Sequence, residues 1–193
     1  MKKTIENLAK AFAGESQARN RYTFYASIAR KEGYEQVAGV FEETANQEKT
    51  HAKMLMRAIQ ELKKNDVDYP AINIPTEVPN VLATTADNLR SAIAGEHYET
   101  VEMYPEFAKV AREEGLTTIA NRLTDIAKAE AHHEERYTKL LNLFEKDIVF
   151  KRGDKVLWMC RECGYVHEGN EAPVVCPVCE HPQAFYQLKC EEY

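Results

Sequence analysis

The sequence predicts a mainly α protein, in which a four-helix bundle with a long connection between its second and third helices precedes a small β-rich metal-binding module. Four long segments before residue 147 carry apolar side chains at alternating steps of four and three residues, which is the spacing of a buried helical seam. Prolines punctuate residues 65–83, and all five cysteines follow residue 159. We therefore expect two domains, residues 1–147 and residues 153–193.

The fourth helix, expected over residues 117–146, carries two polar residues inside its seam. Glu130 and His133 stand where Leu or Ile would be expected. A lone buried carboxylate costs several kcal/mol even after the protein relaxes, so something must compensate it. Residues three apart on a helix face the same way, and a Glu and a His placed so suit a metal ion. The second helix repeats the pattern with Glu48 and His51.

The first and third helices, expected over residues 3–31 and 85–115, place further acids at matching depth. Glu15 lies in the middle of the first seam, and Glu96 and Glu99 lie in the third. Burying five acids together without cations would be prohibitively unfavourable. A buried but metal-free cluster is therefore the less favoured interpretation.

The connections between the helices predict their arrangement. Short turns containing Gly33 and Gly115 join the first helix to the second, expected over residues 35–64, and the third helix to the fourth. Each pair is therefore an antiparallel hairpin. Two hairpins joined by one long crossover, residues 65–83, make a ferritin-like bundle.

The two hairpins look like copies of one another. Ala13-Gly14-Glu15 matches Ala94-Gly95-Glu96, but the distance from that glutamate to the glycine of the turn is 18 residues in the first copy and 19 in the second. We place the additional residue near Pro105 as a bulge, because proline removes a helical hydrogen bond. A duplicated hairpin implies a pseudo-twofold site, which favours two metal ions over one.

The acids and histidines together match a known ligand pattern. Di-iron carboxylate bundles take one Glu from each of two helices and Glu-x-x-His from each of the other two. Oxygen ligands with some imidazole suit iron or manganese better than a thiolate metal. Glu99 could add a seventh ligand from the second hairpin only, or it could be a solvated residue beside the seam. The six residues that fit the pattern are Glu15, Glu48, His51, Glu96, Glu130 and His133.

Two tyrosines and an arginine should point near these ligands. Tyr22 follows Glu15 by seven residues, and Tyr104 follows Glu96 by eight. Each is either a core aromatic with a hydrogen-bonded hydroxyl or a group that orients a carboxylate or a bound oxygen species. Arg19 also falls on a seam, where its suggested role is charge balance.

The C-terminal module contains two CxxC knuckles separated by twelve residues. Four cysteines at this spacing predict a metal site, which can hold zinc as a structural staple or iron as a one-electron centre. Fusion to a di-metal carboxylate site favours iron, since the module could then supply electrons. We expect strands near residues 156–159 and 184–188, and a free thiol at Cys190. The four predicted ligands are Cys160, Cys163, Cys176 and Cys179.

Composition excludes some partners. The net charge is −6 and the basic residues are scattered, so neither nucleic acid nor an anionic membrane is an expected partner. The chain shows neither a signal peptide nor a run long enough to span a bilayer, and we expect a cytoplasmic location. Clustered cysteines in a reducing compartment indicate metal ligation rather than disulfides.

Over its whole length the sequence closely resembles the rubrerythrin family. The resemblance is carried by the paired Ala-Gly-Glu and Glu-x-x-His motifs, by Glu99, by Tyr104-Pro105 and by the rubredoxin-like knuckles. It implies a ferritin-like di-iron domain followed by a rubredoxin-like domain with one iron on four thiolates. A free rubredoxin differs in having a much longer gap between its knuckles and usually Gly, rather than Glu180, after the fourth cysteine.

The resemblance also implies roles for the ligands. Glu48 and Glu130 would bridge the two irons, with Glu15 and Glu99 on the first. His51 would replace Glu99 on that first iron upon reduction. The second iron would be completed by Glu96 and His133.

The activity implied by the resemblance is that of a peroxidase, which reduces hydrogen peroxide to water. Electrons would come from an NAD(P)H-dependent reductase, directly or through a free rubredoxin, and pass through the thiolate-bound iron. The family forms homodimers with electron transfer between subunits. Tyr22 or Tyr104 could hydrogen-bond the peroxide or orient a ligand. The competing functions are a ferroxidase or iron-storage protein, a di-iron oxygenase, and a pure electron-transfer protein.

Overall fold

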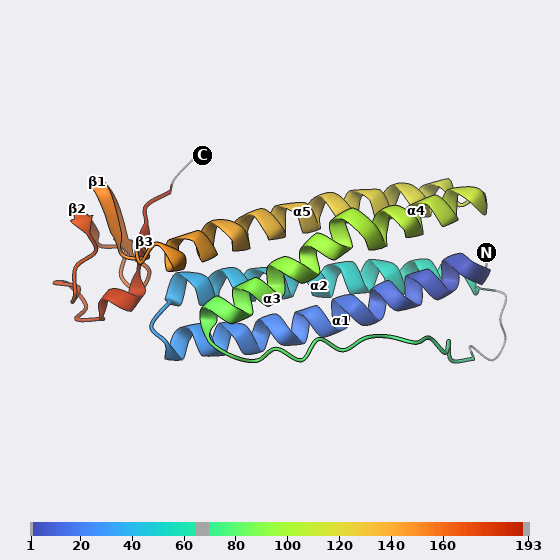
Figure 1. Ribbon diagram of the computed structural model, residues 1–193, viewed down its shortest axis with the longest axis horizontal. Coiled ribbons are helices and arrows are strands. Elements are labelled where there is room, and N and C mark those ends of the chain that lie inside the picture. Colours follow the sequence, from blue (N-terminus) through green and yellow to red (C-terminus); the bar gives the residue numbers. More distant parts are fainter. Residues whose placement is uncertain (1, 65–69, 191–193) are drawn as a thin grey trace.

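The computed structural model describes residues 2–64 and 70–190, and it is mainly helical. A helical domain is followed by a small sheet (Figure 1). The helices of the first domain are α1 (Lys2–Lys31), α2 (Glu35–Leu62), α3 (Thr85–Tyr98), the π-helix η1 (Glu99–Met103), α4 (Tyr104–Glu113) and α5 (Thr117–Glu145).

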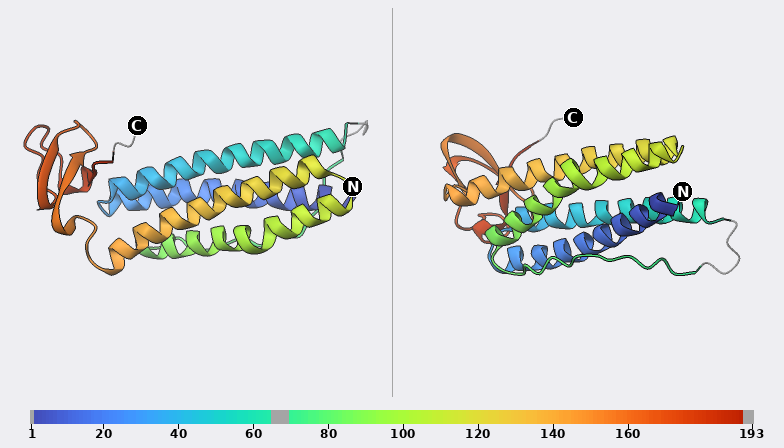
Figure 2. Two further views of the ribbon diagram at one scale, coloured as in Figure 1. Left: turned by 90° about the horizontal axis from the view of Figure 1, so that it is seen from above. Right: turned by 45° about the vertical axis from the view of Figure 1, so that its right-hand side comes forward.

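The helices pair as expected. α1 packs along α2, and α3 and α4 pack along α5, so the bundle consists of two antiparallel hairpins (Figures 1 and 2). The described part of the crossover, residues 70–84, has no helix or strand and runs beside α1 back to the start of α3. The first five residues of the predicted crossover, 65–69, lie outside the described residues.

The additional residue of the second hairpin is in η1. The peptide N–H of Tyr104 donates to the carbonyl of Glu99, five residues back, and Pro105 follows at once. A π-helical turn accommodates one more residue than an α-helical turn, and such bulges are frequent at functional sites. The predicted bulge near Pro105 is thus confirmed.

The apolar core of the bundle has two parts. One part contains Leu8, Leu55 and Leu123, and the other contains Phe41 and Tyr137. The acidic residues lie between these parts, because Glu15 follows Ala11 of the first part and precedes Ala18 of the second. Apolar side chains therefore surround the polar centre at both ends.

The C-terminal module is built on a three-stranded antiparallel sheet. The strands are β1 (Lys151–Cys160), β2 (Val166–Glu171) and β3 (Tyr186–Leu188), in the order β2-β1-β3, with a short 3₁₀-helix, η2 (Gln183–Phe185), before β3. The strand predicted at 156–159 is longer than expected, and the first two residues of the predicted strand 184–188 belong to the 3₁₀-helix η2 instead. β2 was not predicted, because its sequence has little apolar alternation and it forms by pairing with β1.

The module lies at the end of the bundle where α1 turns into α2 (Figures 1 and 2). The ring of Phe150 stacks on Tyr34 in that turn, with centroids 6.1 Å apart and 7° between the planes. None of the described helices is both long enough and apolar enough to cross a membrane.

Candidate metal centres

Helices from all four parts of the bundle bring the predicted glutamates together in its interior. Glu15 comes from α1, Glu48 from α2, Glu96 from α3 and Glu130 from α5, and each is at most 1% exposed. Their carboxylate oxygens form two overlapping groups with the histidines of α2 and α5. The groups are Glu15, Glu48, His51 and Glu130, and Glu48, Glu96, Glu130 and His133.

Glu48 and Glu130 belong to both groups, and each divides its two oxygens between them. The Oε2 atom of Glu48 and the Oε1 atom of Glu130 both lie 2.9 Å from His51 Nδ1. The other oxygen of each lies 3.1 and 2.8 Å from His133 Nδ1. A carboxylate that faces two ligand groups with separate oxygens has the geometry of a bridging ligand.

The remaining glutamates each face one histidine. Glu15 Oε1 lies 3.8 Å from His51 Nδ1, and Glu96 Oε2 lies 3.6 Å from His133 Nδ1. The two imidazole rings are 6.0 Å apart between centroids. The centre therefore has the twofold arrangement that the duplicated hairpins predicted.

Gln47 was not predicted as part of this centre. Its side-chain oxygen lies 2.9 Å from His133 Nε2, so it can accept the hydrogen of that nitrogen. In the neutral imidazole this bond would place the hydrogen on Nε2, so that Nδ1, which faces the glutamates, could bind a metal ion. The signal in the sequence is weak, since Gln47 is simply the residue before Glu48.

Both tyrosines contact the centre, and they do so reciprocally. The hydroxyl of Tyr22 in the first hairpin donates to Glu96 Oε1 in the second at 2.5 Å. The hydroxyl of Tyr104 in the second hairpin donates to Glu15 in the first. Each tyrosine thus orients the glutamate of the opposite hairpin, which is one of the two interpretations that the sequence left open.

Many polar atoms of the centre have no hydrogen-bond partner. Within the described residues, the buried atoms without a hydrogen-bond partner include one oxygen each of Glu15, Glu48 and Glu96, both oxygens of Glu130, and Nδ1 of His133. Unpartnered buried polar atoms are rare and costly in folded proteins. Cations between them would satisfy all of them, so the residues fit a di-metal centre.

Burial and close charges shift the pKa values of the groups in this centre strongly. Burial raises the pKa of Glu15 well above its usual value, and burial raises that of Glu96 to about 8. Burial opposes charge on the histidines as well, but the carboxylates close to Nδ1 of His133 raise its pKa to about 12. For Glu48, burial acts to raise the pKa, yet the closeness of the His133 and His51 rings lowers it to about 2. Metal ions would have to displace the retained protons.

Glu99 is not a member of either ligand group within the described residues. Its carboxylate instead lies at the wall of a cavity of about 560 Å³ beneath the crossover. Burial first, and then the neighbouring charge of Glu15, raise its pKa well above the usual value. Glu99 is therefore close enough to the centre to feel the charges of its glutamates, but it lies outside both ligand groups.

The other residues that the sequence singled out lie outside the centre. Arg19 lines a surface hollow between α1 and α2, together with Lys49 and Lys53. The side chains of His97 and His132 are also exposed. Cys190 is exposed and has no disulfide, which confirms the prediction of a free thiol.

The four knuckle cysteines converge in the C-terminal module. The Sγ atoms of Cys160 and Cys179 are 3.7 Å apart, and those of Cys163 and Cys176 are 3.6 Å apart. Four thiolates held about 2.3 Å from one tetrahedral ion would be about 3.8 Å from each other. The cysteines therefore fit a single metal ion and are too far apart for disulfides.

The second knuckle contains the departure noted in the sequence. Glu180 has φ 61°, and Gly164 has φ 76° at the equivalent place after the first knuckle. Each donates its peptide N–H to the carbonyl of the first cysteine in its knuckle, at 2.9 Å for Gly164 and 3.0 Å for Glu180. Glu180 thus adopts the conformation that glycine takes more easily.

Comparison with known proteins agrees with both centres. The Rubrerythrin family model matches residues 6–141, and the model of the rubrerythrin rubredoxin-like domain matches residues 158–187. The chain belongs to the rubrerythrin family. Rubrerythrin of Porphyromonas gingivalis is 49% identical over 96% of this chain and 89% of its own length. Rubrerythrin of Nitratidesulfovibrio vulgaris is 45% identical over 96% of this chain and 94% of its own.

A solved structure shows the same fold. The partially reduced state of nigerythrin superposes with a TM-score of 0.64 and 35% identity, covering 96% of this chain and 86% of that one. The ferritin-like bundle followed by a small sheet is thus confirmed. The carboxylate and histidine cluster fits the di-iron site of the rubrerythrin family, and the four cysteines fit a rubredoxin-type site. The protein is accordingly an oxidoreductase of this family.

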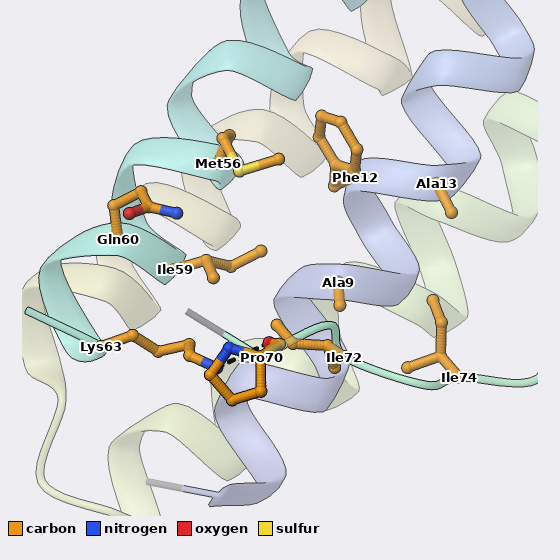
Figure 3. Close-up of a pocket in the computed structure, with 10 residues that line it drawn as sticks. All are labelled: Ala9, Phe12, Ala13, Met56, Ile59, Gln60, Lys63, Pro70, Ile72 and Ile74. Carbon is orange, nitrogen blue, oxygen red and sulfur yellow. Dashed lines mark hydrogen bonds between the residues drawn. The ribbon is translucent and has the colours of Figure 1, made fainter. Parts of the chain in front are cut away.

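An apolar cavity of about 280 Å³ lies elsewhere in the bundle (Figure 3). It is formed by α1, α2 and the crossover, and the amine of Lys63 at its edge donates to the carbonyl of Pro70 at 3.2 Å. None of the predicted metal ligands lines it. A substrate pocket of a di-iron oxygenase would have to expose the metal centre, so this cavity does not favour that alternative.

Proposed function

We propose that this rubrerythrin-family protein is a non-haem di-iron peroxidase that reduces hydrogen peroxide to water. The observation that carries the proposal is the pairing of two centres in one chain: a buried carboxylate–histidine centre with one spare carboxylate, and a four-cysteine centre suited to one-electron transfer. When bound, a ferrous pair supplies two electrons, which with two protons convert one hydrogen peroxide to two waters.

The residues of the chain have distinct tasks in this proposal. Glu48 and Glu130 would hold both irons, Glu15 and Glu99 would belong to the first, and His51 would be the alternative ligand to Glu99 there. Glu96 and His133 would complete the second. The pairing of Glu48 and Glu130 oxygens with separate histidines supports the bridging assignment.

The exchange of His51 for Glu99 follows from charge. Neutral imidazole suits the ferrous ion and a carboxylate suits the ferric ion, because the ligand charge then follows the metal charge. The structure has His51 grouped with Glu15, Glu48 and Glu130, while Glu99 lies outside this group and lines the neighbouring cavity. This is the arrangement that the proposal assigns to the reduced state.

Tyr22 and Tyr104 hold protons beside the centre. Burial, followed by the charge of Glu96 for Tyr22 and of Glu15 for Tyr104, raises both pKa values well above the usual value. Both hydroxyls therefore remain protonated at neutral pH and can donate. We assign them to orienting Glu96 and Glu15, and to hydrogen-bonding the peroxide once it enters.

Cys160, Cys163, Cys176 and Cys179 would hold the iron that supplies one-electron transfer, with an NAD(P)H-dependent reductase or a rubredoxin as the electron donor. Within one chain the module lies at the end of its own bundle, where Arg161 rests against Gly39. From Gly39 to Glu48 helix α2 alone extends about 14 Å. We therefore propose a homodimer in which the module of one subunit approaches the di-iron centre of its partner. We place this reaction in the cytoplasm.

The test compares hydrogen peroxide with dioxygen as the oxidant of protein that has been reduced anaerobically. Fully reduced protein is mixed with hydrogen peroxide and, separately, with dioxygen, and the oxidation of each centre is followed by its visible spectrum. Faster oxidation by peroxide, and peroxide consumption driven by a reductase, are expected. Much faster oxidation by dioxygen with mineral formation would instead indicate a ferroxidase. Reductase-driven electron flow without peroxide consumption would indicate a pure electron-transfer protein.

A further inference from the structure

The cavity beneath the crossover is bounded by three parts of the bundle. α1 provides Gly14 and Arg21, the crossover provides Pro75 and Glu77, and the end of α3 with η1 provides Gly95 and Glu99. Glu99 is the member of this lining that the proposed function also assigns to a metal. The cavity therefore lies directly behind the face of the centre to which Glu99 belongs.

Two glycines face this cavity from the middle of helices. Glycine inside a helix costs roughly 1 kcal/mol relative to alanine. Gly14 and Gly95 lack the positive φ that the described residues show at Gly33, Gly115 and Gly164. Their backbone conformation does not require glycine, and a Cβ atom at either position would make only an ordinary contact at 3.7 Å. A side chain larger than alanine would enter the space above them.

Different side chains lie above the two glycines. A Cβ atom on Gly14 would lie 3.7 Å from Oε1 of Glu99, which is ordinary contact. A Cβ atom on Gly95 would lie 3.7 Å from a terminal nitrogen of Arg21. The duplicated glycines are thus equivalent in sequence and helix position, but only Gly14 has a proposed metal ligand above it.

We infer that Gly14 is a positioning residue that reserves the place where the Glu99 carboxylate lies when it is off the metal. The inference rests on the ligand exchange of the proposed function and extends it to a residue that binds no metal. A hydrogen at this position leaves the withdrawn carboxylate room, whereas a branched side chain would fill the same volume. Without that room, Glu99 would stay on the metal and His51 would be kept off it.

The test is Gly14→Val in the iron-loaded protein, with Gly95→Val as the matched control. Keeping a carboxylate on the metal favours the ferric state, so Gly14→Val should lower the midpoint potential of the di-iron centre. We expect at least a tenfold shift of the redox equilibrium, about 59 mV for a one-electron couple. A crystal structure of the reduced variant should show Glu99 with Glu15 and His51 displaced. Gly95→Val should change neither.

A second variant, Gly14→Ser, tests the opposite sign without a bulky group. Its hydroxyl extends from a Cβ atom 3.7 Å from Glu99 Oε1 and can hydrogen-bond the withdrawn carboxylate. The potential should then rise, by up to about tenfold in the equilibrium, because the bond favours the ferrous arrangement. The visible band of the four-cysteine iron and the helical circular dichroism report whether each variant is folded.

The inference would be wrong if Glu99 still lay in the cavity of reduced Gly14→Val, or if both valine variants shifted the potential equally. It would also be wrong if Gly14→Ser lowered the potential. These outcomes are separate from failure of the proposed function. Potentials and Glu99 positions that change as expected, in a protein that does not consume peroxide, would reject the peroxidase and keep the role of Gly14.

Discussion

The two hairpins of the bundle supply equivalent ligands and orient them for each other. Each contributes one glutamate from its first helix and a Glu-x-x-His pair from its second, and each tyrosine hydroxyl donates to the glutamate of the opposite hairpin. The equivalent pairs are Glu15 with Glu96, Glu48 with Glu130, His51 with His133, and Tyr22 with Tyr104.

The hairpins differ where the second contains η1. The residue three positions after Glu15 is Ala18, which is buried in the apolar core, whereas the residue three after Glu96 is Glu99. The histidines differ as well, since the side chain of His51 is 15% exposed and that of His133 is 3% exposed. A symmetric scaffold therefore provides two equivalent ligand groups. In the proposed function, the additional acid Glu99 and the more accessible His51 would allow one ligand of the first iron to be exchanged.

The largest effect on metal binding should come from removing a ligand that both metal positions share. Replacing Glu48 or Glu130 by Ala removes a ligand from both positions at once, so either variant should lose both irons of the bundle. The iron of the four cysteines should remain, since it binds in a separate module. Metal analysis with the visible spectrum measures both. Glu42→Ala, which alters a partly exposed residue of α2, is the control. Retention of one bundle iron in either variant would contradict the bridging role.

Lowering the pH should weaken metal binding at both positions. The pKa values of Glu96 (about 8) and His133 (about 12) are raised in the metal-free centre, so both groups hold protons below these values. A metal ion must displace these protons, and its apparent affinity therefore rises with pH. Between pH 8 and pH 6 we expect the affinity to fall about 100-fold or more. Zinc titrations of metal-free protein across this range measure it, and a constant affinity would contradict the assignment.

Removing the asymmetric ligand should affect turnover more than loading. Glu99→Ala leaves the six symmetric ligands in place, so both bundle irons should still bind. Peroxide turnover per loaded centre should fall by about tenfold or more, because the ferric state loses the carboxylate that matches its charge. Stopped-flow oxidation of the reduced protein and metal analysis together measure this. If loading collapses while turnover per loaded centre stays normal, the exchange of His51 and Glu99 is not part of the reaction.

The reciprocal tyrosines should give effects of similar size. Tyr22→Phe and Tyr104→Phe each leave one glutamate without its buried donor. Loss of a group that orients a metal ligand typically costs about 10- to 100-fold in affinity or activity. We expect each variant to lose about tenfold in metal affinity or turnover. A large loss in only one of them would show that the peroxide, rather than the twofold scaffold, needs that hydroxyl.

The sequence was sufficient to predict the repeated features of the molecule, but not those that depend on a single side chain. Helical periodicity placed Glu48 and Glu130 in the interior, and the difference in spacing between the copies predicted the bulge that η1 provides. Periodicity could not predict that Gln47 binds His133 or that Glu99 is directed into a cavity, since both depend on rotamers and on the path of the crossover. Strand β2 was missed because pairing with β1, rather than its own residues, makes it a strand.

The two cysteine knuckles of the small module are also a repeated pair whose equivalent residues can be compared. The smallest effect, a change in the stability of the module, is expected there. Gly164 and Glu180 adopt the same left-handed conformation and make the same backbone hydrogen bond. A non-glycine residue in this conformation costs roughly 1–2 kcal/mol, and glycine loses roughly 0.5–1 kcal/mol of additional chain entropy on folding. Glu180→Gly should therefore stabilise the metal-loaded module by up to about 1 kcal/mol, whereas Gly164→Ala should destabilise it. Urea unfolding, followed through the band of the four-cysteine iron, compares the two. Destabilisation by Glu180→Gly would mean that the glutamate side chain contributes more than its backbone costs, and that the knuckles are equivalent in shape but not in energy.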